Sequence, residues 1–348
     1  MINFNNPKHI FVIAEAGSNW KIGTYDDDLK QAKKLIKIAS DSGADAVKFQ
    51  TYRPESTYVS NPGLSDYLTK NGISDDISKI FEKHSMPYEM IPELVDSCNE
   101  ENILFMSTPF SINDAKIINQ FVSIHKIASF EINHIRLLDF LAKTNKPIIV
   151  STGASTYEEI DFCVNRIKSH GNDNIILLQC TSKYPCPSSS LNLSVIPKMK
   201  SRYNLPIGFS DHSLDSTIAP LVSIGLGATV IEKHFTSDKN LSGPDHSFAL
   251  NPTELKSMIN SIREAELTLG SGIKEILDDE IELRSFATRS IQAITDISKG
   301  DILQEGVNFE ILRSGNRSRG LDARFLEIIN GKKSLKDVKK DEGILEYE

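Results

Sequence analysis

The chain has 348 residues, of which 39% are apolar and 25% are charged, the balance of an ordinary globular protein. Lys and Arg number 39 while Asp and Glu number 47, which gives a formal net charge of −8. This acidic balance argues against a nucleic-acid-binding surface and against an anionic-membrane-binding surface, but it leaves room for a local basic pocket.

Apolar runs typical of strands alternate with segments of helical spacing up to Gly270. The predicted strands are residues 10–17, 46–52, 104–110, 125–131, 147–153, 174–182, 205–212 and 228–235. The predicted helices are residues 27–40, 89–101, 112–121, 135–143, 156–169, 191–201, 217–226 and 252–269. Nearly continuous apolar strands that alternate with helices are typical of a parallel sheet covered on both faces. Eight such units favour an α/β fold of the (β/α)8 TIM-barrel type, with an open doubly wound sheet as the alternative.

Two connections in this pattern are long, namely residues 53–86 after the second predicted strand and residues 236–252 after the eighth. Loops of this length are often lids or binding loops, although they can also be passive. Residues 271–288 are charged and predicted to be helical, and we interpret residues 271–286 as a linker. The barrel domain is therefore expected to comprise residues 1–270.

A second unit, residues 287–348, carries a weak internal repeat. Residues 296–303 return as residues 337–345, and each copy predicts a short strand, a turn and another strand. Between the copies, residues 312–320 form a Gly/Ser loop with three arginines. This loop is either solvated or an anion contact, because the guanidinium group matches carboxylate and phosphate.

Cysteine usage and the N-terminus bear on the compartment. The four cysteines show neither a zinc-type C-x-x-C pair nor the density of a disulfide framework. The first apolar run, residues 10–14, is too short for a signal peptide and lacks a basic lead. No apolar run approaches the length of a membrane span. We therefore expect a reduced, cytoplasmic protein.

Polar side chains stand at the C-terminal ends of the predicted strands, which meet on the face where α/β barrels carry their chemistry. His212 and His234 follow neighbouring apolar runs. Neutral imidazole suits Mn, Fe, Co or Zn, so this pair predicts a divalent-metal site, unless the two histidines are unrelated.

Two lysines, Lys48 and Lys126, lie inside apolar strands, where a charge needs a fixed partner. That partner is either a substrate anion or a structural ion pair with Glu15 or Glu131. A barrel rim with two lysines, several hydroxyl groups and a pair of candidate metal ligands suits a phosphorylated, carboxylated substrate such as phosphoenolpyruvate.

Nine stretches of the chain resemble the sialic acid synthase family, the phosphoenolpyruvate-condensing nonulosonic acid synthases, in family order and spacing. They are AEAGSN (14–19), GADAVKFQT (43–51), STPF (107–110), KIASFE (126–131), VSTG (150–153), CTSKYP (180–185), GFSDHS (208–213), VIEKHF (230–235) and SGPDH (242–246). Residues 287–348 resemble the family's antifreeze-like (SAF) domain, a small β-clip fold.

The resemblance implies a reaction. The family condenses phosphoenolpyruvate with the open-chain form of an N-acylated aminosugar such as N-acetylmannosamine, which releases phosphate and forms a nine-carbon 2-keto-3-deoxy acid. Relatives make legionaminic or pseudaminic acid from 6-deoxy diacetamido sugars. Family members are domain-swapped dimers, in which the SAF domain of one subunit reaches the barrel mouth of the other.

The resemblance also implies roles for individual residues. It assigns His212 and His234 as metal ligands, usually for manganese. The phosphoenolpyruvate-binding residues that it implies are Lys48, Lys126, Ser129, Ser151 and Ser210. Glu15 and Glu232 match acidic residues near the reacting centre, and Glu131 is expected to handle the proton of the attacking water. Positions that match the sugar side are Thr108, Gln50, Tyr184, Asp245 and Arg313, the last of these reaching the sugar across the dimer.

The chain departs from the family pattern at three places. Trp20 stands where the family usually has His, residues 21–25 lengthen the turn that follows, and Ser182 stands where the sialic acid branch often has Asn. These departures are expected to lie at the barrel mouth, which leaves the identity of the sugar open. Residues 242–246 look more like the sialic and legionaminic branches than the pseudaminic one.

Two other classes of function stay open. A Schiff-base aldolase would also use barrel lysines on a carbonyl substrate, without a metal. A non-catalytic carbohydrate- or ice-binding protein rests on the SAF resemblance alone.

Overall fold

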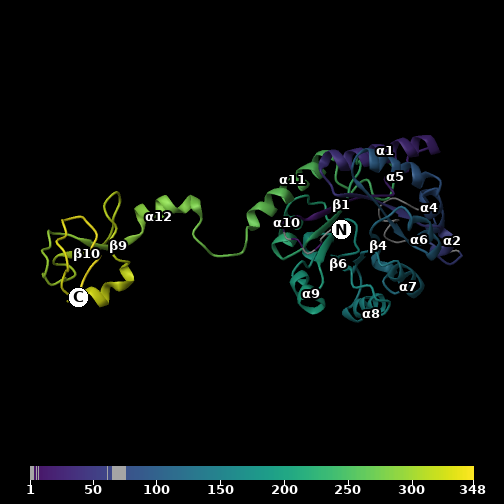
Figure 1. The fold of residues 1–348 in the computed structure, drawn as a ribbon. Helices are drawn as coiled ribbons and strands as arrows, with labels where there is room; N and C mark the ends of the chain where they lie inside the picture. Colours follow the sequence, from purple (N-terminus) through teal and green to yellow (C-terminus); the bar gives the residue numbers. More distant parts are fainter. Residues whose placement is uncertain (1–3, 5, 7, 61, 65–75) are drawn as a thin grey trace. The chain divides into compact units, whose positions relative to one another are not determined.

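The computed structural model describes residues 4, 6, 8–60, 62–64 and 76–348, so part of the long connection 53–86 lies outside the described residues. The chain divides into two units after Gly270. Figure 1 shows strands surrounded by helices in the first unit and a smaller unit with short strands at the C-terminal end of the sequence.

The first unit contains one sheet of eight parallel strands in the order β3-β2-β1-β8-β7-β6-β5-β4. The strands are β1 Phe11–Gly17, β2 Ala46–Thr51, β3 Leu104–Pro109, β4 His125–Ile127, β5 Ile148–Ser151, β6 Ile175–Cys180, β7 Ile207–Asp211 and β8 Val230–His234. The two end strands, β3 and β4, are in contact with each other, which nearly closes the sheet. The prediction of a (β/α)8 TIM barrel is thus confirmed, and the doubly wound alternative is wrong.

Helices follow the strands and surround the barrel. They are α1 Tyr25–Ser42, α2 Pro54–Thr57, α4 Ile77–His84, α5 Met90–Glu100, α6 Ile112–Ile118, α7 Ile135–Lys143, α8 Tyr157–Lys168, α9 Val195–Tyr203, α10 Ile218–Gly225 and α11 Pro252–Leu269. The predicted bounds of α7 and α11 match the structure. The start of α11 is well specified because Asn251 and Glu254 form a capping box around Pro252 at the first helical turn.

Alternate residues of each strand face two different apolar layers. The layer inside the barrel includes Ile13, Met106, Leu178 and Val230. The larger layer between strands and helices is built from the residues in between, for example Phe209. Polar residues that replace the inner layer at the C-terminal strand ends therefore converge on one another.

Each of the eight barrel strands is shorter than its predicted range, and the difference is largest for β4. Residues 125–131 were expected to be extended, but β4 ends at Ile127 and residues Ser129–Glu131 form a 3-10 turn. The turn forms because the amide of Glu131 donates to the carbonyl of Ala128 at 3.0 Å. As a result Glu131 does not lie on the extended path of β4.

The second unit holds an antiparallel pair, β9 Arg289–Ala293 and β10 Phe309–Arg313, around a core that includes Ile291 and Phe309. Its helical pieces are α12 Ile281–Ala287, α13 Leu326–Ile329 and the 3-10 turns Asp278–Glu280 and Ala323–Phe325. The small antiparallel sheet fits a β-clip.

The prediction of helix across residues 271–288 is wrong for residues 271–277, which are not helical. Gly270 and Gly272 have φ angles of 60° and 71°, a conformation that a right-handed helix cannot continue.

The internal repeat of the second unit is real in three dimensions, although its two copies form isolated bridges in place of the predicted strands. Ile297 and Val338, which are equivalent in the two copies, exchange two hydrogen bonds of 2.8 Å each. The Asp337 carboxylate accepts from the amide of Lys299 at 2.7 Å, and the Asp296 carboxylate accepts from the amide of Lys340 at 2.8 Å. Each copy therefore caps the turn of the other.

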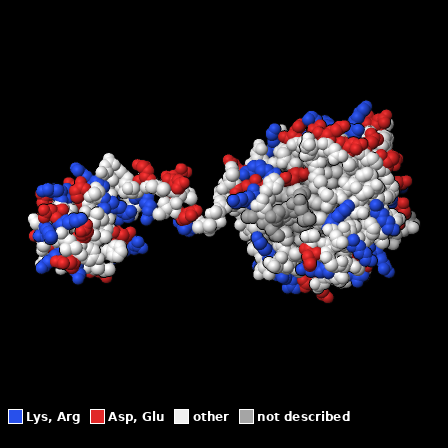
Figure 2. Space-filling view, viewed as in Figure 1, with Lys and Arg blue, Asp and Glu red and all other residues white. Residues whose placement is uncertain are grey.

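Among the described residues, no helix is both long and apolar enough to cross a membrane. In the view of Figure 2, acidic and basic side chains are both present on each unit, and acidic ones are frequent along the upper edge of the larger unit.

Candidate active site

A buried ion-pair network lies at the C-terminal ends of β1, β2 and β8. Lys48 forms an ion pair with Glu15, and its Nζ lies 3.7 Å from Oε2 of Glu232. The same ammonium group donates to Oγ1 of Thr108 at 3.1 Å. Gln50 donates to Oε1 of Glu15 at 2.8 Å. The ion pair between Lys48 and Glu15 that the sequence allowed is thus present, whereas the alternative pair with Glu131 is not.

A second lysine reaches the same carboxylate from the other side of the barrel. Lys126 Nζ donates to Oγ of Ser151 at 2.7 Å and lies 3.6 Å from Oε1 of Glu232. Ser210 donates to that oxygen at 3.0 Å. Glu232 therefore joins the strand ends of β2, β4 and β7, and it stands between two ammonium groups.

Burial and charge set the protonation of this network. Burial alone would raise the pKa of Glu232, but Lys126 and Lys48 lower it to about 2. Burial lowers the pKa of Lys126, which Glu232 only partly offsets. Burial acts in the same sense on Lys48, yet Glu15 and Glu232 raise its pKa above the ordinary value. Glu232 is thus a carboxylate, and its buried Oε2 accepts no hydrogen bond from the described residues.

Two imidazoles form the other half of the site. The ring centroids of His212 and His234 lie 5.6 Å apart. Tyr184 packs on His212 with a centroid distance of 4.0 Å, and Phe248 packs on His234 at 5.2 Å. Burial lowers the pKa of His212 to about 3, so this ring is neutral. The aromatic walls keep both rings in fixed planes.

The donor atoms of this pair fit a divalent metal ion. His212 donates from Nδ1 to the carbonyl of Thr181 at 2.9 Å, which leaves Nε2 with its lone pair. Nδ1 of His234 is buried and has no hydrogen-bond partner among the described residues. No group of three or more His, Cys, Asp or Glu in the described part of the chain could hold a metal. Two imidazoles can therefore supply part of a coordination shell, with oxygen ligands from solvent or substrate completing it.

A chain of contacts connects the lysine half to the histidine half. Oγ of Ser129 accepts from the amide of Gly153 at 3.0 Å and lies 3.7 Å from Sγ of Cys180. This sulfur lies 3.8 Å from Nδ1 of His212. A Cβ at Gly153 would lie 2.9 Å from Ser129 Oγ and would clash with Ser182, so only glycine fits here.

Asp245 sits beside the histidine half. Its Oδ2 accepts from the amide and the hydroxyl of Ser18 at 3.3 and 3.0 Å and lies 3.9 Å from Nδ1 of His234. Gly17 has a φ of +53°, and a Cβ there would lie 2.7 Å from Asp245 Oδ2. The turn after β1 therefore holds this carboxylate close to the barrel mouth.

Two of the predicted site residues stand apart from the network. Glu131 forms no side-chain hydrogen bond or ion pair with the described residues, and burial raises its pKa to about 7. Arg313 belongs to the second unit, where it is exposed and ends β10, so its prediction as a loop residue is wrong.

Trp20 does not lie at the barrel mouth as expected. It is 1% exposed and belongs to the apolar layer between strands and helices. The presence of Trp20 in place of the family's His therefore changes the packing between strands and helices and not the lining of the site. A second departure, Ser182, does reach the site, because its buried Oγ lies against Gly153 and has no hydrogen-bond partner among the described residues.

Sequence reasoning missed Cys180 and Phe248. Cys180 lies in the CTSKYP stretch, but its apolar thiol gave no reason to single it out. Phe248 follows the SGPDH stretch by two residues, and only the fold of that connection brings it against His234.

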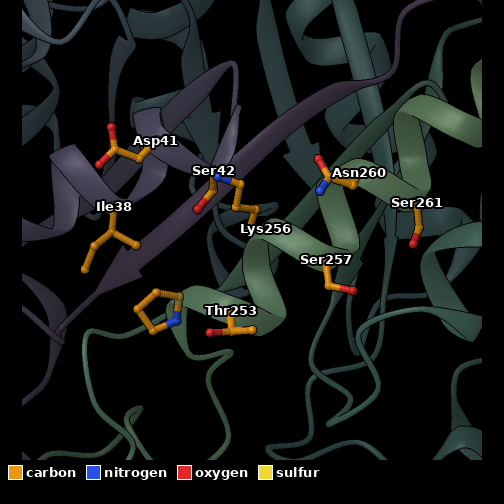
Figure 3. A pocket seen from close by; sticks show the side chains of 9 residues that line it. Ile38, Asp41, Ser42, Thr253, Lys256, Ser257, Asn260 and Ser261 are labelled. Carbon is orange, nitrogen blue, oxygen red and sulfur yellow. The ribbon is translucent and has the colours of Figure 1, made fainter.

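A separate pocket lies on the outer wall, between α1 and α11 (Figure 3). Its volume is about 550 Å³, and its lining includes Asp41, Ser42, Lys256 and Asn260. It contains no residue of the strand-end network and is not part of the site.

Comparison with known proteins connects this geometry to a family. The model of the NeuB family matches residues 35–274. A pseudaminic acid synthase of Campylobacter jejuni is 38% identical over 340 residues, covering 97% of this chain and 96% of the relative. An N,N'-diacetyllegionaminic acid synthase of the same species is 38% identical over 343 residues, covering 97% of this chain and 100% of the relative.

A solved structure extends the similarity to the fold. The crystal structure of the spore coat polysaccharide biosynthesis protein SpsE of Bacillus subtilis superposes with a TM-score of 0.64 at 39% identity, covering 97% of this chain and 94% of that chain.

Proposed function

Because the chain belongs to the NeuB family, we propose that it condenses phosphoenolpyruvate with the open-chain form of an N-acylated mannosamine-type sugar. The products are phosphate and a nine-carbon 2-keto-3-deoxy acid. The observation that supports this most is the buried network in which Lys48 and Lys126 flank Glu232 beside the imidazoles of His212 and His234. Few reactions other than one between a small polyanion and a polarised carbonyl need both halves in one barrel mouth.

The lysine half would bind phosphoenolpyruvate. Lys48 and Lys126 are ion-pair partners of buried acidic side chains, so an incoming phosphate or carboxylate can take over part of that pairing without a new charge being buried alone. Hydroxyl groups that can donate to its oxygens are those of Ser129, Ser151 and Ser210.

The histidine half would hold a divalent metal ion, which we take to be Mn²⁺, through His212 and His234. When bound, this ion supplies Lewis-acid polarisation of the sugar aldehyde. The chain's own contribution is to keep His212 neutral and in one tautomer through the carbonyl of Thr181.

In the condensation, C3 of phosphoenolpyruvate forms a bond to the aldehyde carbon of the sugar, whose oxygen gains a proton. Water adds to C2 and loses one proton, and when the C2–O bond to phosphate breaks, the new C2 hydroxyl becomes the keto group and its proton leaves with the phosphate. Glu131 would take the proton of that water, because a carboxyl with a pKa of about 7 exchanges protons readily at neutral pH. Glu15 and Glu232 would stabilise positive charge that develops at C2.

The sugar side would be formed by Thr108, Gln50, Tyr184 and Asp245, which lie around the two halves. A 6-deoxy diacetamido sugar is the second candidate substrate, since a pseudaminic and a legionaminic acid synthase are both 38% identical to this chain. Equal identity to both does not select between them.

We also propose that the enzyme is a cytoplasmic, domain-swapped homodimer in which residues 287–348 act as an SAF domain. Arg313 would reach the sugar in the partner's barrel, which its exposed position on β10 permits. Co-expression of Arg313→Ala with Glu131→Gln should then restore part of the activity that each variant lacks alone. No recovery in demonstrated heterodimers would rule out this composite site.

The central test is phosphate release with phosphoenolpyruvate and Mn²⁺ across a panel of N-acylated mannosamines and 6-deoxy diacetamido sugars. We expect release with one sugar class, loss with a chelator and recovery with Mn²⁺. Release that survives chelation, together with borohydride trapping of substrate on Lys48 or Lys126, would point to the Schiff-base mechanism instead.

A further inference from the structure

Lys233 is a fully buried cation that the proposed reaction does not use. On β8, Val230 belongs to the apolar layer inside the barrel, while Ile231 and Phe235 belong to the layer between strands and helices. By this alternation Lys233 points outward, between Glu232 and His234, which point to the barrel mouth. Lys233 is 1% exposed, so its ammonium group lies in the outer layer without access to solvent.

All three donors of this ammonium group are used on one neighbouring segment. Lys233 Nζ donates to Oδ2 of Asp211 at 2.7 Å, to the carbonyl of Ser213 at 2.6 Å and to the carbonyl of Asp215 at 2.9 Å. The other carboxylate oxygen of Asp211 accepts from the amide of Ser213 at 2.8 Å. Lys233 thus connects the turn after β7 to the C-terminal end of β8.

His212 lies inside the segment that is fastened. Asp211 and Lys233 are direct partners in the β7–β8 register, so His212 and His234 are each one residue beyond this pair. The carbonyl of His212 accepts from the amide of Cys186 at 2.8 Å, and its ring is held by Thr181 at 2.9 Å. The remaining freedom of the turn is therefore removed by Lys233.

We propose that Lys233 and Asp211 are positioning residues that set the relation between the His212 and His234 rings. The inference rests on the proposed metal-binding role of these rings. Among the described residues, Lys233 Nζ donates only to Asp211, Ser213 and Asp215, so it acts on the rings through the backbone that carries them.

This role differs from a contribution to stability alone. A buried ion pair can be replaced by uncharged residues with little loss of stability, whereas removing one partner leaves a buried charge uncompensated. If the pair only stabilised the fold, an uncharged replacement of both residues would restore the site. If it positions the rings, the replacement restores folding but not the site, because the carbonyl of Ser213 loses the Lys233 donor and the carbonyl of Asp215 keeps only the Ser213 hydroxyl, at 3.4 Å.

The test compares Lys233→Met and the double variant Asp211→Asn/Lys233→Met with wild type. Mn²⁺ affinity is measured by calorimetry on the full chain without substrate. The tautomer of the His212 ring is read by nitrogen NMR of histidine-labelled, metal-free protein. We expect a 10- to 100-fold weaker Mn²⁺ affinity, of the order seen when groups that orient metal ligands are removed, and a mixed tautomer for His212.

Lys146→Met is the matched control. Lys146 also donates to backbone carbonyls, those of Asn119 and Val122, the latter at 2.9 Å, but it precedes β5 at the other end of the barrel. This variant should lower the melting temperature and leave both readouts unchanged.

A folded Lys233→Met or double variant with the Mn²⁺ affinity and the His212 spectrum of wild type would overturn the inference. If the single variant does not fold, the double variant carries the test. If wild type itself binds no Mn²⁺, the proposed metal site fails, and the His212 spectrum alone then decides whether Lys233 positions the ring.

Discussion

The two halves of the site solve the problem of burial in opposite ways. In the lysine half, Lys48 and Lys126 are surrounded by Glu15 and Glu232, so charge is balanced by charge within the barrel. In the histidine half, burial and aromatic contacts keep His212 neutral, and a buried nitrogen of His234 has no hydrogen-bond partner among the described residues.

This difference indicates how each half binds. In the lysine half each charged side chain already has an oppositely charged neighbour, although Oε2 of Glu232 accepts no hydrogen bond from the described residues, so an anion binds by exchanging one partner for another. In the histidine half, Nδ1 of His234 has no hydrogen-bond partner among the described residues, so this half gains most from binding a cation. Substitutions in the histidine half should therefore abolish function while sparing the fold, whereas those in the lysine half also disturb buried charge.

The largest effect is expected for His212→Ala or His234→Ala. Each removes one of the two imidazoles, so Mn²⁺ affinity should fall by more than about 100-fold and phosphate release should be lost. The melting temperature of the metal-free protein should change little. Near wild-type turnover after chelation and Mn²⁺ repletion would refute the assignment of the histidine half.

Glu131→Gln tests whether Glu131, which belongs to neither half of the site, takes the proton of the attacking water. We expect kcat to fall by about 10²–10⁴-fold, the usual contribution of a general base. In wild type, kcat should rise with pH through about 7, where Glu131 ionises, and the variant should lose this rise. A pH–rate profile that is unchanged in shape would exclude Glu131 from the role.

The same carboxyl predicts a pH dependence of stability. Its pKa is raised on folding, so the stability it contributes is present below about 4.5 and is lost as pH rises through about 7. Glu131→Gln should therefore gain stability relative to wild type at pH 8 compared with pH 5, as measured by the melting temperature.

Lys126→Met should raise the KM for phosphoenolpyruvate far more than the KM for the sugar. Removing one partner of a desolvated charge contact costs about 2–5 kcal/mol, which corresponds to about 30- to 4000-fold. Steady-state kinetics with each substrate varied in turn measures the split, and Lys146→Met serves as control. An unchanged phosphoenolpyruvate dependence would make Lys126 a structural ion-pair partner only.

The smallest effect is expected for Gly153→Ala, which acts at the junction between the halves. A Cβ would lie 2.3 Å from Ser182 Oγ, 2.9 Å from Ser129 Oγ and 3.0 Å from Cys180 Sγ, so all three side chains must shift. Such overpacking costs about 1–3 kcal/mol, and we expect about a tenfold loss of kcat/KM with a lowered melting temperature. Full activity would show that the halves tolerate independent movement.

Sequence patterns predicted which residues stand at the strand ends, because the periodicity of apolar residues fixes where a strand runs and which face it buries. They did not predict which of these side chains form hydrogen bonds with one another. That Gln50 donates to Glu15, and that Lys126 donates to Ser151, depends on strand register and side-chain reach, which single strands do not encode.

Trp20, whose place was misjudged, and Lys233, for which no prediction was made, show the same limit. Trp20 follows a site motif in sequence but turns into the outer layer. Lys233 stands between two site residues, yet strand alternation aims it away from the mouth, where its role depends on a turn that only the fold brings near. Proximity in sequence thus predicted which residues lie near the site, but it did not predict which face of the sheet each side chain points to.

The repeat in the second unit has a consequence for how this unit comes apart. The bonds that complete its two turns join residues 38 and 44 positions apart, so neither turn can be finished until both copies are in place. Local fraying of one copy removes the caps of the other, and their amides should exchange hydrogen at one common rate. A chain that ends before Asp337 would lack the caps of the turn in residues 296–303, and we expect proteolysis within these residues while β9 and β10 stay paired.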